Sequence, residues 1–133
     1  MKIAVLWGTV FGLLQAIITL VVSIYFSSPS VATLACIGLL LSLALTVACG
    51  LIGAIQAKAF GIGFWAGIIA TGFDVVAGLI GYVINPTLRE VGVVASVISF
   101  AISIGFGVVL SAVGAGIGYL IYSKFMNPAQ IKS

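Results

Sequence analysis

The sequence predicts an all-α integral membrane protein, a four-helix transmembrane bundle that forms a single domain over residues 1–133. The first observation is composition: hydrophobic residues make up 63% of the chain and charged residues 5%, whereas soluble domains carry roughly 25% charged residues. The second is that the few charged residues are separated by apolar runs long enough to cross a bilayer. The third is that all three prolines fall outside or between these runs, where a missing backbone donor does not interrupt a helix.

The first three apolar runs each exceed the about 20 residues that a transmembrane helix needs. They cover residues 3–26, 31–57 and 59–84. The first run is longer than the roughly 7–15 apolar residues of a signal peptide, and only Lys2 precedes it. We therefore expect it to be a retained span.

The fourth run, residues 91–123, would be about 50 Å long as one helix at 1.5 Å per residue. Such a helix cannot stand upright in a hydrocarbon core of roughly 30 Å. Either it tilts strongly, or residues 91–96 form an interfacial or protein-covered segment before the span. Ser96 and Ser99 interrupt the start of the run and favour the second alternative.

The basic residues predict the topology and exclude one class of partner. The net charge is +3, but the basic residues are scattered singly, so we expect a lipid bilayer and no nucleic acid as partner. With four spans, Lys2, Lys58, Lys124 and Lys132 lie on one side and Arg89 lies on the other. The positive-inside rule then places both termini of this multi-pass protein in the cytoplasm.

Residues that usually bind metals or cofactors are scarce. The chain has no histidine, no CxxC pair and no carboxylate cluster, so it predicts no metal ligand set, no haem or chlorophyll ligands and no cofactor. Cys36 and Cys49 lie about 20 Å apart on one predicted helix, which is too far for a disulfide. We expect both to act as small apolar residues.

Every predicted span carries a face of small residues repeated every three or four positions, which places them on one side of a helix. Because lipid tails are as apolar as leucine, membrane helices associate largely through such close-packing faces. The sequence therefore predicts tight contacts within the chain, between copies of it, or with other transmembrane subunits. The glycines of these faces, called the glycine faces below, are Gly8, Gly12, Gly50, Gly53, Gly63, Gly67, Gly78, Gly81, Gly107, Gly114 and Gly118. The hydroxyl residues on the same faces are Thr19, Ser23, Ser42, Thr46, Thr71, Ser99, Ser103 and Ser111.

Asp74 and Gln15 are the candidate functional residues. Asp74 lies near the middle of the third span, where an aspartate is unfavourable by about 2.5–3.5 kcal/mol, so it should face protein or water. Gln15 lies at similar depth in the first span and could donate a hydrogen bond to the carboxylate. Two interpretations stay open: Asp74 carries a proton or cation, or it is a polar contact between helices or subunits.

Two features of the sequence bear on its ancestry. A shift of 59 residues brings Gly8 onto Gly67 and Gln15 onto Asp74, as a duplication into two parallel helical hairpins would do. The stretch CGLIGAIQAKAFGIGFWAGIIATGFDVVAGLIGYVI, residues 49–84, resembles the hairpins of small, uncharacterised glycine-rich four-span prokaryotic membrane proteins. This resemblance implies a prokaryotic plasma membrane and transfers no activity or site residue.

The function expected from these features is that of a small structural or accessory subunit of a larger membrane complex, which packs against partner spans through the glycine faces. One alternative is a small oligomeric transporter or channel for ions or protons that uses Asp74, and another is a holin-like pore former. We expect no catalytic residue and no enzyme, because Ser99, Ser103 and Ser111 have no histidine or lysine near them in the sequence to activate them.

Overall fold

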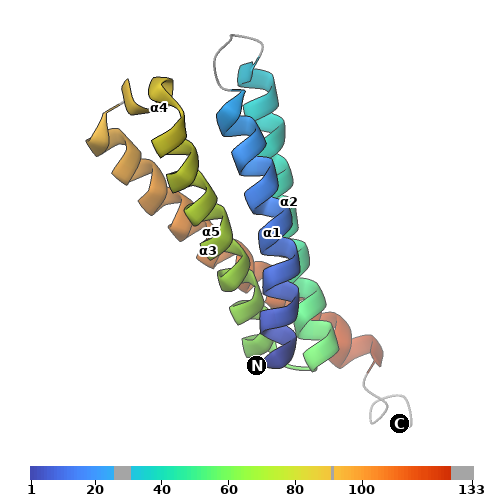
Figure 1. Ribbon diagram of the computed structural model, residues 1–133. Coiled ribbons are helices and arrows are strands. Elements are labelled where there is room, and N and C mark those ends of the chain that lie inside the picture. Colours follow the sequence, from blue (N-terminus) through green and yellow to red (C-terminus); the bar gives the residue numbers. More distant parts are fainter. Residues whose placement is uncertain (26–30, 91, 127–133) are drawn as a thin grey trace, which may run out of the picture.

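The computed structural model describes residues 1–25, 31–90 and 92–126, of which 31–35, 93, 95 and 96 are described in their backbone only. Its helices are α1 (Lys2–Ile24), α2 (Val31–Ala57), α3 (Phe60–Ile84), the short α4 (Pro86–Glu90) and α5 (Val93–Ile121), which continues as the π-helical turn η1 (Tyr122–Met126) (Figure 1). Four of these helices are long and apolar enough to cross a membrane. The predicted all-α four-helix membrane bundle is confirmed.

The helices form two antiparallel hairpins, α1 with α2 and α3 with α5 (Figure 1). The most extensive interface joins α1 to α3, and α2 and α3 each contact all the other long helices. By contrast, α1 and α5 share no comparable interface. The hairpins run parallel, as a duplication would require, but this diagonal contact between α2 and α3 has no counterpart between α1 and α5.

The connection between α2 and α3 is a tight cap at Lys58. Lys58 adopts the left-handed region with φ of 55°, and the amide of Ala59 donates to Ala54 O at 3.2 Å while that of Lys58 donates to Ile55 O at 3.3 Å. These two bonds form a Schellman motif, which usually has glycine at the left-handed position. Two residues therefore suffice to reverse the chain.

The interior of the bundle consists of small side chains, and the large apolar side chains face outward. The buried apolar residues are alanines together with Cys49, whereas leucines, isoleucines and valines of all four long helices are exposed. A neighbouring helix occupies the position beside every residue of the glycine faces. A methyl group at Gly50, for example, would lie 2.9 Å from Ser111 O on α5, and one at Gly12 would lie 2.7 Å from the Phe73 ring on α3. The glycine faces are thus used for contacts within the chain.

The fourth apolar run forms one helix from Val93 onward, and whether its start lies at the membrane interface stays a prediction. Residues 93–96 are the first turn of α5, which is helical without interruption to Ile121, and Figure 1 shows α5 leaning across α1 and α2. A separate short helix, α4, lies before the run. Gly92, with φ of 91°, makes the turn between α4 and α5, a conformation that favours glycine.

The described basic residues lie at the two ends of the bundle. Lys2, Lys58 and Lys124 lie at the end that holds the N-terminus, and Arg89 lies in α4 at the opposite end. Lys132 is outside the described residues. The arrangement has the sidedness that the basic residues predicted, and the assignment of the lysine end to the cytoplasm stays a prediction.

Candidate functional site

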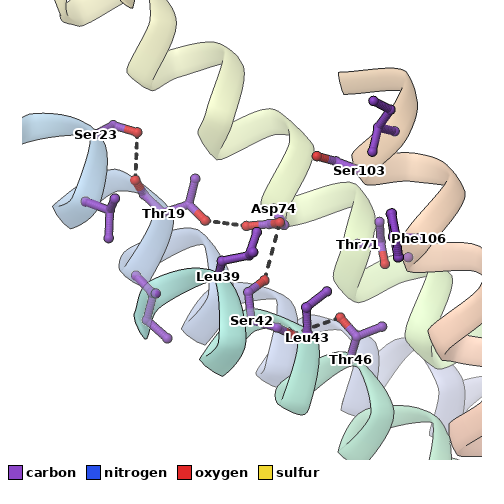
Figure 2. A pocket seen from close by; sticks show the side chains of 15 residues that line it. Thr19, Ser23, Leu39, Ser42, Leu43, Thr46, Thr71, Asp74, Ser103 and Phe106 are labelled. Carbon is purple, nitrogen blue, oxygen red and sulfur yellow. Dashed lines mark hydrogen bonds between the residues drawn. The ribbon is translucent and has the colours of Figure 1, made fainter. Parts of the chain in front are cut away.

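A cavity of about 410 Å³ lies among the four long helices, in the half of the bundle nearest the C-terminal ends of α1 and α3. Figure 2 shows side chains from all four helices around it. The hydroxyl residues that the sequence distributes over separate spans therefore meet around one space. The lining residues are Ile18, Thr19, Val22, Ser23, Gly38, Leu39, Ser42, Leu43, Thr46, Thr71, Asp74, Ile102, Ser103, Phe106 and Gly107.

Asp74 extends from the middle of α3 toward this cavity, between α1 and α2 (Figure 2). Thr19 Oγ1 on α1 donates a hydrogen bond to Asp74 Oδ1, and Ser42 Oγ on α2 donates a weak one to Oδ2 at 3.4 Å. A carboxylate offers about four lone-pair positions, so these two bonds leave acceptor capacity on both oxygens. The side chain contacts protein and the cavity, as its depth in the span requires.

Other hydroxyl groups around the cavity use their hydrogens on their own helices. Thr46 Oγ1 donates to Ser42 O at 3.1 Å, Thr71 Oγ1 donates to Gly67 O at 3.0 Å, and Ser23 Oγ donates to Thr19 O at 2.7 Å. Because these hydrogens are occupied, the hydroxyl oxygens can act only as acceptors, and that of Thr46 already accepts from Gln15 Nε2. A lining of hydroxyl and carboxylate oxygens favours positive charge in the cavity.

Gln15 lies next to this group but does not bind Asp74. Its side chain is fully buried, and Nε2 donates to Ser42 O at 2.9 Å and to Thr46 Oγ1 at 2.7 Å, both on α2. An amide nitrogen has two hydrogens, so none is left for the carboxylate, and the anticipated direct bond is replaced by a link through Ser42. Gln15 Oε1 is buried without a hydrogen-bond partner in the described structure.

No basic side chain neutralises Asp74 within the described part of the chain. The described lysines and arginine lie at the ends of the helices, and α3 extends about 15 Å beyond Asp74 at 1.5 Å per residue. The partners of the carboxylate are the two hydroxyls named above. Hydroxyl groups distribute a negative charge but do not cancel it, so the site carries an uncompensated charge when Asp74 is ionised.

The cavity ends where the glycine faces bring the helices into backbone contact. A methyl group at Gly114 on α5 would lie 3.0 Å from Val47 Cα on α2, and one at Gly50 would lie 3.0 Å from Ala115 N. Toward the cavity α2 and α5 separate, as Figure 1 shows, while α5 stays against α3 through Gly107 and Thr71. One half of the bundle is therefore closed, and the other half is open between α2 and α5.

The sequence identified Asp74, Gln15 and the hydroxyl residues, but not that they enclose a cavity. What the sequence did not indicate is the separation of α2 from α5. That separation depends on where the close glycine contacts give way to the larger side chains Leu39, Leu43 and Phe106.

A comparison of the chain with protein-family models, with curated proteins and with solved structures finds no match. The case for function accordingly depends on the geometry of this site.

Proposed function

We propose that the chain is a small membrane transport protein that binds a cationic solute or ion at Asp74. The observation that carries this proposal is a carboxylate near the middle of α3, without a basic partner in the described structure, that lines a cavity among the four long helices. Ionisable groups at membrane depth commonly mark ion and substrate pathways. Here the carboxylate also has unused acceptor capacity and a space in which a ligand fits.

The asymmetry of the bundle supports transport over a purely structural role. Transporters bind substrate near the middle of the bilayer in a site that is open to one side at a time. In this chain the cavity reaches Asp74 from one half, and glycine contacts between α2 and α5 close the other half. A rocking motion of α5 against α2 about these contacts is the simplest change that would alter access.

The test is cation flux in liposomes that contain the purified protein. Gradients of protons, alkali-metal ions and quaternary ammonium ions are applied one at a time, with a pH-sensitive dye or isotope uptake as the readout. We expect protein-dependent flux of at least one class that is lost in Asp74→Asn. Gly116→Ala is the control, because nothing lies within 4 Å of a methyl group at that position. Equal flux in wild type and Asp74→Asn for every class would contradict the proposal.

A second candidate is the accessory subunit of a larger complex. The glycine faces, which favoured this role in the sequence, contact other helices of the same chain. Gly72 on α3 and Gly105 on α5, however, are exposed, and nothing lies within 4 Å of a methyl group built at either position. These positions favour a contact with another transmembrane helix. Purification from a native membrane in mild detergent, followed by mass determination of the intact particle, tests it: a second chain at fixed stoichiometry is expected, and a pure homo-oligomer would exclude it.

A further inference from the structure

We propose that the ligand of the Asp74 cavity is a small organic monocation with an apolar body, such as a quaternary ammonium or a protonated amine. Its charged group lies at Asp74, and its body lies against the apolar side chains of α2 and α5. This inference rests on the proposed function and specifies the class of solute.

The size of the cavity is the first argument. Its volume of about 410 Å³ falls within the roughly 300–1,000 Å³ of sites for small organic molecules. A bare metal ion is far smaller and needs several oxygens in direct contact, usually from more than one carboxylate. Within the described residues no group of three His, Cys, Asp or Glu side chains is placed to hold a metal ion. The site therefore has the dimensions of an organic ligand.

The charge of the lining is the second argument. One carboxylate contributes the only formal charge among the lining residues, which matches a monovalent cation. The hydroxyl of Thr71 presents an acceptor oxygen, since its hydrogen is donated to Gly67 O, and Asp74 keeps acceptor capacity on both oxygens. An anion or a neutral ligand that needs donors would find few of them here, whereas a cation gains from every one of these oxygens.

The apolar walls and the route of access are the third argument. Leu39 on α2 and Ile102 and Phe106 on α5 line the cavity and are 62%, 54% and 59% exposed. The same side chains thus face both the cavity and the surroundings of the bundle, at the depth of the membrane-spanning helices. A solute with an apolar body can enter between α2 and α5 from the bilayer, and a hydrated inorganic ion cannot. Phe106 also offers an aromatic face for a cation.

Benzyltrimethylammonium is the test ligand, because it has a permanent charge and an apolar ring. Its uncharged isostere is neopentylbenzene, and tetramethylammonium has the charge without the ring. Equilibrium dialysis of the purified protein in detergent, corrected with empty micelles, measures binding. We expect saturable binding of one ligand per chain that Asp74→Asn weakens by a factor of about 30, the loss expected on removing one partner of a buried charge pair. Tetramethylammonium and neopentylbenzene should each compete at least about tenfold more weakly.

The outcomes separate this inference from the proposed function. Binding that is absent, or equal in Asp74→Asn, overturns the inference, provided circular dichroism and gel filtration show that both proteins are folded. Asp74-dependent flux of protons or alkali-metal ions without binding of benzyltrimethylammonium overturns the inference and leaves the transport proposal in place. Absence of Asp74-dependent flux for every cation class overturns the transport proposal itself. Gly116→Ala should bind like wild type.

Discussion

The closed half of the bundle predicts that substitution of two glycines of α5, two residues apart, has very different effects on stability. A methyl group at Gly114 would come within van der Waals overlap of Val47 O and 3.0 Å from Val47 C and Cα on α2, while nothing lies within 4 Å of one at Gly116. The obstacle at Gly114 is backbone, which cannot rotate away as a side chain can. Gly114→Ala must therefore push α2 and α5 apart.

The magnitude follows from the cost of overpacking a close contact, about 1–3 kcal/mol. We expect Gly114→Ala to lower the free energy of unfolding by that amount and Gly116→Ala to change it by less than about 0.5 kcal/mol. Unfolding of the purified proteins in mixed micelles with increasing SDS, followed by circular dichroism, measures both. If Gly114→Ala were as stable as Gly116→Ala, the backbone contact between α2 and α5 would be wrong, and with it the closed end of the cavity.

Three further predictions concern single side chains. Thr19→Val removes the hydroxyl that donates to Asp74 and should lower the free energy of unfolding by about 0.6–1.7 kcal/mol. The same SDS titration measures this change, and an unchanged midpoint would contradict the hydrogen bond. Lys58→Gly relieves a left-handed backbone with φ of 55° and should raise the free energy of unfolding by about 1 kcal/mol, whereas a lower midpoint would argue against that conformation. A membrane-permeant maleimide should label Cys36, which is exposed, and should not label Cys49, which is fully buried. Mass spectrometry of labelled wild type and Cys36→Ala measures this difference, and rapid labelling of Cys49 in the folded protein would refute the packing of α2.

Most of the fold follows from the sequence because it depends on local patterns. Apolar runs bounded by Lys2, Lys58 and Arg89 specify four spans, and the spacing of glycines specifies which side of each helix packs closely. The start of α5 was harder to predict from the sequence, because the position of this helix end depends on one backbone turn at Gly92. The left-handed conformation of Lys58 was not indicated either, since lysine rarely takes the place of glycine in such a cap.

The site could be predicted only in part, because a cavity depends on relations between helices. Asp74 was identified from its depth alone, and Gln15 from its position on the same side of a neighbouring span. The actual partners, Thr19 and Ser42, depend on the relative rotation of α1, α2 and α3. That rotation is set by contacts such as those of Gly12 with Phe73. The pattern of a single sequence indicates which side of each helix packs closely, but not which sides of two helices contact each other.

The energetics of Asp74 provide a test of whether it is a structural contact or a binding group. An aspartate at this depth costs about 2.5–3.5 kcal/mol, and interhelical hydrogen bonds in membranes average about 0.6 kcal/mol each. The bonds from Thr19 and Ser42 therefore offset only about 1.2 kcal/mol, which leaves roughly 1–2 kcal/mol uncompensated in the ligand-free protein. A binding site tolerates such a cost because a ligand offsets it, whereas a structural contact has no reason to keep it.

Asp74→Asn removes the charge and keeps an acceptor for Thr19 or Ser42, so the ligand-free variant should be at least as stable as wild type. Unfolding in SDS titrations of ligand-free wild type and Asp74→Asn measures this difference. Adding benzyltrimethylammonium should then stabilise wild type more than Asp74→Asn, because the ligand shifts the transition according to its affinity for the folded state. A ligand-free Asp74→Asn less stable than wild type would instead identify Asp74 as a structural contact between α1, α2 and α3.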